Sequence, residues 1–145
     1  MPPAMLDTDI LSEVMGGRNP IVQERALAYL AEYQRLSFSL ITRYEILRGL
    51  KAEHATRQIL AFDELCRASD VLPLTEPIAV RAAEIYANFR QQGQIISDAD
   101  ILIAATALTY GLILVTGNVV HFARIGGLRI ENWAENWIEN WKELP

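Results

Sequence analysis

Cysteine and histidine are scarce in this chain, which excludes several kinds of site. Cys66 is the only cysteine in 145 residues, so neither a disulfide framework nor a thiolate metal cluster can form, and a reducing cytosol is the simplest compartment. The two histidines, His54 and His121, have no Cys or second His at metal-ligand spacing. We expect His54 to be a solvated helix residue and His121 to lie in a turn.

Long apolar runs are also missing. The most apolar segment, residues 101–115, includes two threonines and a tyrosine and is shorter than the ~20 residues that a membrane helix needs. The first ten residues have neither a basic region nor a long apolar stretch, which argues against a signal peptide. We therefore expect a soluble, cytoplasmic protein without a membrane partner.

The chain has no surplus of basic residues. It carries 13 Lys and Arg against 18 Asp and Glu, a net charge of −5, which argues against binding nucleic acid through a generally basic surface. Nucleic-acid binding is still compatible with this total, because carboxylates in a metal site would count toward it while the surface nearby stayed basic. The sequence also lacks a glycine-rich phosphate loop and a nucleophile elbow around a serine.

What the sequence does contain is organised around residues 97–118. Ser97 lies three residues before Asp100, which is capping-box spacing and predicts the start of a helix. This helix should end at Gly111 and lead into a buried strand at 112–115. The polar residues 116–118 would then lie at the carboxyl edge of a parallel sheet, where α/β proteins bind their ligands.

Short strands and helices alternate along the rest of the chain. Asn19 followed by Pro20 predicts the start of one helix, and Asp9 is the expected N-cap of the helix before it. The expected strands are 4–7, 36–40, 71–74, 112–115 and 128–130, and the expected helices are 10–16, a segment from 20, 41–50, 55–67, 77–92 and 98–110. This alternation predicts one α/β domain whose parallel sheet is covered on both faces.

The helix expected at 77–92 is amphipathic. Its inner face is predicted to carry Ile78, Ala82, Ile85, Tyr86 and Phe89. We expect it to close at the glycine that follows and to pack on the sheet.

The C-terminal segment repeats Glu-Asn-Trp at four-residue intervals. On a helix, this spacing places Trp133, Trp137 and Trp141 in one stripe. The stripe is expected either to dock a terminal helix on the domain or to bind a partner, because tryptophans concentrate at interfaces. We therefore divide the chain into a main domain at residues 1–132 and a Trp-rich helical extension of it at 133–145.

Four carboxylates stand at the ends of predicted elements: Asp7, Glu45, Asp98 and Asp100. Strand ends and helix starts share one edge of a parallel sheet, so these groups can converge there with Asn118. Carboxylates at hydrogen-bonding distance repel one another, and a divalent cation removes the conflict. Oxygen ligands without His or Cys favour Mg²⁺ or Mn²⁺ over zinc.

Each of these residues also has a structural explanation. Asp100 completes a capping box with Ser97, and Glu45 completes another with Thr42. Asp98 offsets the helix dipole in a first turn. Glu45 and Arg48 form an i,i+3 ion pair worth a few tenths of a kcal/mol. It is the joint pattern, and no single residue, that indicates a metal site.

Four segments, in their order and separation, resemble the motifs of the PIN-domain family, and most closely those of the VapC toxins of bacterial toxin–antitoxin pairs. They are LDT at 6–8, ITRYEILRGL at 41–50, DILIAATAL at 100–108 and LVTGNVVHF at 114–122. The resemblance runs from about Met5 to Trp133, and the remaining Trp-rich extension lies outside the family pattern.

The resemblance implies a three-layer α/β/α domain with a central parallel sheet of four to five short strands. Its acidic pocket would bind Mg²⁺ or Mn²⁺ and hydrolyse RNA phosphodiesters. Asp7, Glu45 and Asp100 match the three core acids of the family, and Asn118 matches the fourth position, which is Asp in many members. Thr116 matches a hydroxyl that commonly supports the site.

Two positions depart from the family pattern. Asp9 stands where Asn is usual in similar toxins, and Gly117 stands where a second Asn or an Arg is common. We count Asp9 and Asp98 as supporting residues of the pocket.

The resemblance also implies roles for the site residues. Asp7 and Asp100 would hold the metal, which lowers the pKa of water and neutralises charge on the phosphate. Glu45 would be a further ligand or the base that takes a proton from water. A small antitoxin would insert near the acidic pocket, and a homodimer is expected. The candidate cations for RNA binding are Arg43, Arg48, Lys51 and Arg90.

Two alternatives compete with a nuclease. A phosphatase of the haloacid-dehalogenase type shares the pattern Asp7-Thr8-Asp9, but that family needs a lysine and then paired acids downstream, where this chain has only Lys142. The other alternative is a catalytically weak or inactive PIN-fold module that binds RNA or protein. Asn118 and Gly117 are the features that permit it, and an amide at position 118 removes one negative charge.

Overall fold

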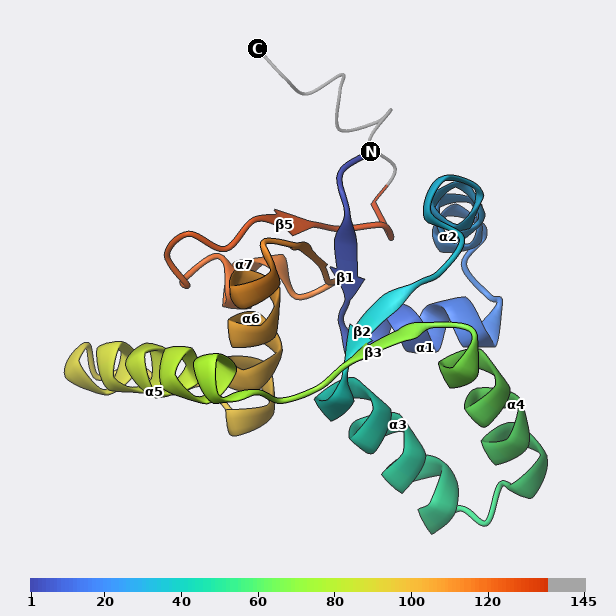
Figure 1. Cartoon of the computed structure of the whole chain (residues 1–145), viewed down its shortest axis with the longest axis horizontal. Helices are drawn as coiled ribbons and strands as arrows, with labels where there is room; N and C mark the ends of the chain where they lie inside the picture. The colour runs from blue at the N-terminus through green and yellow to red at the C-terminus, as the bar shows by residue number, and fades with distance from the viewer. Residues whose placement is uncertain (136–145) are drawn as a thin grey trace.

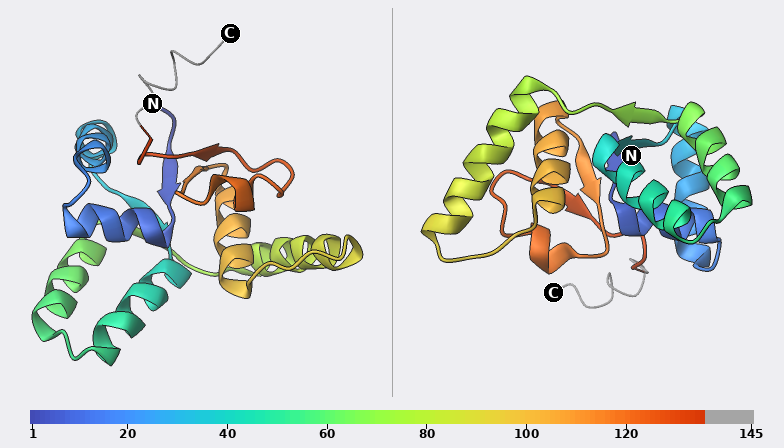
Figure 2. Two further views of the ribbon diagram at one scale, coloured as in Figure 1. Left: turned by 180° about the vertical axis from the view of Figure 1, so that it is seen from behind. Right: turned by 90° about the horizontal axis from the view of Figure 1, so that it is seen from below.

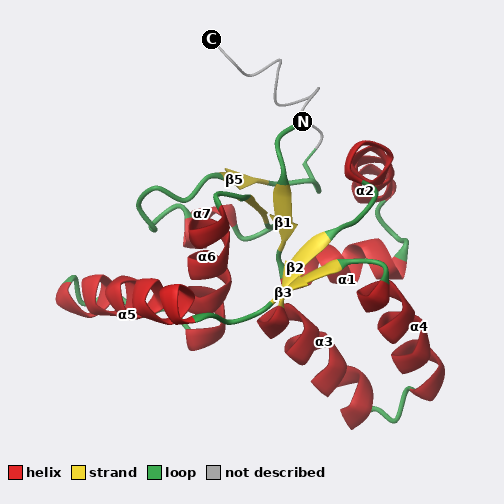
Figure 3. Ribbon diagram, viewed as in Figure 1, coloured by secondary structure: helices red, strands yellow, loops and turns green. Residues whose placement is uncertain are grey.

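The computed structural model describes residues 1–135. Its centre is a five-stranded sheet in which every pairing is parallel, in the order β3-β2-β1-β4-β5 (Figures 1 and 3). The strands are β1 Ala4–Leu6, β2 Ser37–Ser39, β3 Asp70–Leu72, β4 Ile113–Val115 and β5 Ile130–Glu131. The predicted α/β fold with four to five short parallel strands is confirmed.

The helices of the described part of the chain connect these strands. They are α1 Thr8–Gly16, α2 Pro20–Tyr33, α3 Leu40–Ala52, α4 Thr56–Arg67, α5 Glu76–Gln91, α6 Asp98–Tyr110 and α7 Val119–Phe122. Figure 2 shows α5, α6 and α7 on one side of the sheet and α1 to α4 on the other. The molecule therefore has the three layers that the resemblance implied.

Each face of the sheet buries its own core, because side chains alternate along a strand. Met5 and Leu114 belong to one core, together with apolar side chains of α5, α6 and α7. Leu6 and Val115 belong to the other, together with side chains of α1, α2 and α4. The two central strands are thus held from both sides, which makes their carboxyl ends a rigid platform.

Several helix ends follow the predicted caps. The Ser97 hydroxyl accepts a hydrogen bond from the backbone N–H of Asp100 at 3.2 Å, as the capping-box spacing predicts. The Asn19 side chain caps α2, with Pro20 as the first helical residue. Helix α6 ends at Gly111, whose φ of 66° is a left-handed conformation that glycine adopts without strain.

The predicted start of the first helix is wrong. Helix α1 begins at Thr8, and its N-cap is Asp7, whose carboxylate accepts a hydrogen bond from the Thr8 N–H. Asp9 lies in the first turn and is not the cap. Asp and Asn are good caps at either position, so the local sequence does not distinguish the two.

The predicted start of the third helix is also wrong. Helix α3 begins at Leu40, and the hydroxyl of its N-cap, Ser39, accepts from the N–H of Ile41 at 3.0 Å. Thr42 is therefore inside the helix and fully buried, and Glu45 lies in the second turn. The capping-box explanation of Glu45 does not hold.

Three smaller predictions also need correction. Tyr86 is 47% exposed, because the inner face of α5 is the narrower stripe that carries Ile78, Ala82, Ile85 and Phe89. His54 is exposed as predicted but lies in the turn after α3, with a φ of 53°. His121, predicted to lie in a turn, is in the single-turn helix α7.

Trp133 is the only tryptophan of the Glu-Asn-Trp repeat that falls within the described residues. It is 1% exposed and packs in the core with α1, α2 and α4, where its ring centre lies 5.8 Å from that of Tyr29. Trp137 and Trp141 lie outside the described residues, and so does the predicted stripe. Within residues 1–135, no helix combines the length and apolar character needed to cross a bilayer.

Candidate active site

The strand order makes β1 the point where the sheet's connections diverge. The chain runs from β1 to β2 and β3 on one side and crosses to β4 and β5 on the other. In open parallel sheets, such a switch point leaves a crevice outside the carboxyl ends of the strands. Asp7 directly follows β1 and Thr116 directly follows β4, and the register that pairs Leu6 with Val115 brings the two together.

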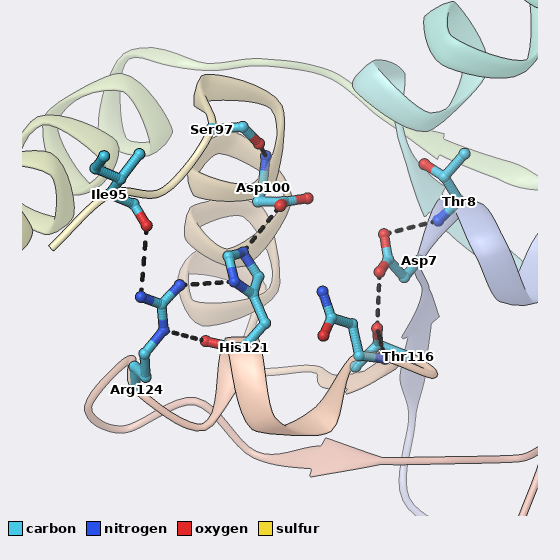
Figure 4. A network of polar contacts seen from close by, with 9 residues as sticks. Asp7, Thr8, Ile95, Ser97, Asp100, Thr116, His121 and Arg124 are labelled. Carbon is cyan, nitrogen blue, oxygen red and sulfur yellow. Dashed lines mark hydrogen bonds and ion pairs between the residues drawn. The ribbon is translucent and has the colours of Figure 1, made fainter.

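Asp7 is 7% exposed, and both of its carboxylate oxygens accept hydrogen bonds (Figure 4). The backbone N–H of Thr8 donates to Oδ1 at 2.7 Å, and the hydroxyl of Thr116 donates to Oδ2 at 2.8 Å. The Thr116 oxygen itself accepts from the backbone N–H of Asn118 at 3.0 Å. This contact orients the hydroxyl hydrogen toward Asp7, so the scaffold fixes the carboxylate.

Burial raises the pKa of Asp7 from 3.8 to about 7. The hydrogen bond from Thr116 acts in the opposite direction, and the negative charge of Asp9 raises the pKa again. The Thr8 N–H lowers it, and the charge of Asp100 adds a smaller increase. Asp7 thus sits where an ionised carboxylate is disfavoured, and a nearby cation would relieve both causes of the increase.

Asp9 and Gly117, the two departures from the family pattern, contact each other. The backbone N–H of Gly117 donates to Asp9 Oδ2 at 3.1 Å. A Cβ at position 117 would lie only 2.7 Å from the same oxygen. Glycine at 117 is therefore what allows a carboxylate at position 9 to approach the tip of β4.

Asp100 reaches the same region from the first turn of α6. Its side chain is 31% exposed, and its Oδ2 lies 2.9 Å from Nε2 of His121. In Figure 4, one oxygen of Asp100 faces the His121 ring and the other points away from it, toward the side on which Asp7 lies. Asp100 therefore lies close enough to Asp7 for its negative charge to raise the pKa of Asp7.

Glu45 is linked to Asp7 through Thr8. The Thr8 hydroxyl donates to Glu45 Oε1 at 2.8 Å, while the backbone N–H of the same residue binds Asp7. The Thr42 hydroxyl lies 3.0 Å from that of Thr8, and since the Thr8 hydrogen is used by Glu45, Thr42 is the donor. Arg48 lies 3.7 Å from the other Glu45 oxygen, which confirms the predicted i,i+3 pair.

The last two predicted site residues differ in position. Asn118 lies at the tip of β4 next to this group, since its backbone N–H binds the Thr116 hydroxyl, and its exposed side chain makes no capping hydrogen bond for α7. Asp98 is exposed and lines a hollow of about 540 Å³ between α5 and α6, together with Tyr86 and Leu102. The lining of this hollow includes none of the other predicted site residues.

The predicted RNA-binding cations differ in their side-chain contacts and in their exposure to solvent. Arg43 donates to Asp63 Oδ1 and to Cys66 Sγ, each at 3.1 Å, so it ties α3 to α4. The side chain of Arg48 is 59% exposed next to Glu45. Lys51 and Arg90 are exposed.

The oxygen donors of the crevice fit a divalent ion held by few protein ligands. Within residues 1–135, no group of three or more His, Cys, Asp or Glu side chains is arranged to hold a metal. Mg²⁺, however, is commonly bound through one or two carboxylates, with water and substrate phosphates completing its coordination. The Asp7–Asp100 pair, with a raised pKa at Asp7, meets that requirement.

Sequence reasoning missed three residues that shape this site: Thr8, His121 and Arg124. Thr8 bridges Asp7 and Glu45, and its place between Asp7 and Asp9 in the sequence is the signal that indicates this role. Arg124 donates to Nδ1 of His121 at 2.6 Å. The contacts of His121 and Arg124 depend on where α7 packs against α6, and nothing in their local sequence indicates that.

Comparison with known proteins gives a consistent result. The PIN domain family model matches residues 4–128. The tRNA(fMet)-specific endonuclease VapC of Shigella flexneri is 30% identical over 131 residues, which cover 90% of this chain and 97% of that protein. Ribonuclease VapC1 of Haemophilus influenzae (strain R2866) is 32% identical over 132 residues, which cover 90% of this chain and 98% of that protein.

A solved structure agrees with these relatives. The crystal structure of DNA-bound VapBC from Salmonella typhimurium has a TM-score of 0.80 and 30% sequence identity, and the match covers 92% of this chain and 99% of that chain. The resemblance predicted from four short motifs is confirmed, and the family match at residues 4–128 includes the strands β1 to β4 and the helices α1 to α7. The chain belongs to the PIN-domain family.

Proposed function

We propose that this protein is a divalent-metal-dependent endoribonuclease, the toxin of a VapBC-type toxin–antitoxin pair. The observation that carries the proposal is the buried carboxylate of Asp7, crowded by Asp9 and Asp100 at the switch point of the sheet. Two relatives of nearly the same length are named as a tRNA endonuclease and a ribonuclease. Together, these findings support hydrolysis of RNA phosphodiesters at this crevice.

Asp7 and Asp100 are the residues that would hold Mg²⁺ or Mn²⁺. When bound, such an ion lowers the pKa of water for the attack and offsets negative charge on the phosphate. Thr8 and Thr116 keep the Asp7 carboxylate oriented through their two hydrogen bonds. The protein thus supplies two carboxylate ligands: Asp7, which is fixed at the end of β1, and Asp100, which is more exposed on α6.

Glu45 is better suited to act as a base than as a metal ligand. It does not form a metal-holding group with Asp7 and Asp100 among the described residues, and its Oε1 is fixed by the Thr8 hydroxyl. Its side chain is 22% exposed, so water can reach it. A carboxylate held in this way can accept the proton of an attacking water.

The RNA backbone needs cations close to the acids, and Arg48 is the strongest candidate. Its guanidinium carbon lies 5.1 Å from the ring centre of Tyr44, which is 57% exposed. A flexible arginine beside an exposed aromatic ring offers both a charge for phosphate and a surface for an unstacked base. Lys51 and Arg90 are secondary candidates, and Arg43 is engaged with Asp63.

The test is metal-dependent cleavage of a mixed pool of tRNA and mRNA. We expect the parent protein to cleave RNA with Mn²⁺ or Mg²⁺, to lose activity in EDTA and to lose it in the Asp7→Asn variant. If no metal-dependent product appears and the variant behaves like the parent, the enzymatic proposal is wrong.

A non-catalytic RNA- or protein-binding module is the second candidate. Two observations favour it: Asn118 supplies no charge, and the described residues form no three-ligand metal group. Such a module would still retain RNA in a filter-binding assay while giving no product at any Mn²⁺ concentration. That combination would select it over the nuclease.

The proposed partners follow from the same site. The similar Salmonella structure is named as VapBC, and a small antitoxin that covers the acids with a basic side chain such as Arg would compete for the Asp7–Asp100 pair. Expression of this chain alone should arrest growth, and co-expression of an antitoxin encoded beside it should restore growth. A homodimer in the cytosol is the expected free form, and light scattering on the purified protein would test it.

A further inference from the structure

We propose that His121 is a positioning residue for Asp100, and that Arg124 fixes His121 in the form that can play this part. The inference rests on the proposed metal site, because the property it concerns is how Asp100 presents an oxygen to a divalent ion. Neither residue belongs to the acidic set predicted from the sequence.

The contact between His121 and Asp100 joins two elements that carry the site. Nε2 of His121, on the helix that follows the tip of β4, lies 2.9 Å from Oδ2 of Asp100 on α6. The two side chains are 23% and 31% exposed. The Phe122 ring packs edge-on against the imidazole, with 5.2 Å between ring centres.

Arg124 determines which nitrogen of His121 carries the hydrogen. Its Nη2 lies 2.6 Å from Nδ1 of His121, and a guanidinium can only donate hydrogen bonds. Nδ1 must therefore be the acceptor, which places the ring hydrogen on Nε2. Nε2 can then donate to Asp100.

Arg124 is itself held in place by several contacts. Its Nε donates to the backbone carbonyl of His121 at 2.9 Å, and its Nη1 donates to the carbonyl of Ile95 at 3.4 Å. Its guanidinium carbon lies 4.9 Å from the ring centre of Phe89. Figure 4 shows the resulting line of contacts from Ile95 through Arg124 and His121 to Asp100. Few of these atoms can move without breaking another contact.

The consequence concerns the geometry of the Asp100 carboxylate. With Oδ2 bound to His121, the plane of the carboxylate is fixed and Oδ1 is the oxygen left free toward the crevice. Asp7 is oriented by the backbone and a buried hydroxyl, whereas Asp100 is on a more exposed helix turn and obtains its orientation from this chain. Hydrogen bonds to ligating groups commonly change metal affinity by 10–100-fold.

The test compares Mn²⁺ binding by full-length, untagged variants in calorimetry. His121→Ala should weaken Mn²⁺ binding about tenfold, and Arg124→Gln should weaken it by a smaller factor. His121→Gln should retain most of the affinity of the parent. The amide nitrogen of glutamine is the same number of bonds from Cα as Nε2 of histidine, so its N–H can donate to Asp100 in the same way. His54→Asn, a matched change at the exposed histidine after α3, should bind like the parent. The midpoint of thermal unfolding without metal shows whether each variant is folded.

A second readout reports the tautomer directly. The chain has two histidines, so in His54→Asn the imidazole signals of a long-range ¹H–¹⁵N spectrum belong to His121. The spectrum should show a protonated Nε2 and an unprotonated Nδ1, and Arg124→Gln should introduce the other tautomer. A protonated Nδ1 with an unprotonated Nε2 in His54→Asn would overturn the inference even if His121→Ala fails to fold.

The outcomes separate this inference from the proposed function. If the parent binds Mn²⁺ and Asp100→Asn abolishes the binding, but His121→Ala binds as tightly as the parent, only the positioning role is wrong. If the parent does not bind Mn²⁺, the metal site is wrong and the positioning role falls with it. Weakened binding by His121→Ala that His121→Gln also fails to restore would overturn the donor role of Nε2.

Discussion

The two sides of the crevice hold their carboxylates in different ways. On the β1 side, Asp7 is 7% exposed and bound by a backbone N–H and a fully buried hydroxyl. On the α6 side, Asp100 is 31% exposed and bound by a histidine that depends on an exposed arginine. The ionised form of Asp7 is thus destabilised by burial, and the side chain is held by the fold. Asp100 is closer to solvent, and its side chain is held by other side chains. Changes on the two sides should therefore affect stability and metal binding in different proportions.

The largest expected effects come from removing either acid. Asp7→Asn and Asp100→Asn should each lower RNA cleavage by more than the 10- to 100-fold that loss of an outer hydrogen-bond partner costs. Their stabilities should differ: at pH 8 without metal, Asp7→Asn removes a buried charge and should raise the free energy of unfolding by about 2 to 4 kcal/mol. Asp100→Asn should change it by less than about 1 kcal/mol.

Cleavage assays and urea denaturation measure the two properties, and Glu64→Gln on the exposed face of α4 is the control. Equal stability changes in the two variants would show that Asp7 and Asp100 are in similar environments. The comparison between the two sides would then be wrong.

The next effect is the pH dependence of stability. The pKa of Asp7 is raised from 3.8 to about 7 in the folded protein, so between these values the folded state keeps a proton that the unfolded chain has lost. The stabilisation that this retained proton gives the folded state is fully present below about pH 4 and is lost as the pH rises through 7. The free energy of unfolding should decrease by about 4 kcal/mol over this range. Denaturation of the metal-free protein from pH 4 to 8 should show this slope, and Asp7→Asn should lack it.

Saturating Mn²⁺ at pH 8 should offset the loss, because the ion binds the ionised form and stabilises the folded state by mass action. Parallel pH profiles for the parent and Asp7→Asn would contradict the assignment of the slope to Asp7.

Much of the fold could be predicted because the local signals agree. Ser97 with Asp100, Asn19 with Pro20 and Gly111 each provide a cap whose effect does not depend on distant residues. The alternation of strands and helices predicted a parallel sheet, and the carboxyl edge of that sheet predicted where the acids gather. The family motifs added which acids to choose.

The errors arise where two local solutions compete or where packing decides. Ser39 and Thr42 are both good caps, and Ser39 is used because β2 ends there and its hydroxyl reaches the Ile41 N–H. The contact between His121 and Asp100 spans 21 positions of sequence, so it depends on the packing of α7 against α6. Local periodicity carries no information about it.

A smaller effect is expected from the hydroxyl that supports Asp7. Thr116→Val leaves the Asn118 N–H and one oxygen of Asp7 without their partner, which should cost about 1 to 3 kcal/mol. Because this hydrogen bond lowers the pKa of Asp7, its loss should also move Mn²⁺ binding to higher pH. Thr116→Ser keeps the hydroxyl and should behave like the parent in both denaturation and calorimetry. A valine variant as stable as the parent, with an unchanged pH dependence of Mn²⁺ binding, would contradict the role of the hydroxyl.

The smallest predicted effect concerns the Asp9–Gly117 contact. In Gly117→Ala, the new Cβ would lie 2.7 Å from Asp9 Oδ2, so Asp9 must turn away and lose one hydrogen bond, which we expect to lower cleavage about fivefold. Asp9→Ala combined with Gly117→Ala should be no worse than Asp9→Ala alone, because the clash is gone. Additive losses in the double variant would show that the two positions act independently.

The central claim is that Asp7 and Asp100 hold one divalent ion between them. Anomalous diffraction from crystals soaked in Mn²⁺ tests it most directly. The account predicts a single strong peak at the carboxyl edge of β1 and β4, in contact with one oxygen of each acid at the ~2.1 Å typical of a six-coordinate divalent ion. A peak that contacts only one of the two acids, or no peak in the crevice at saturating Mn²⁺, would contradict it.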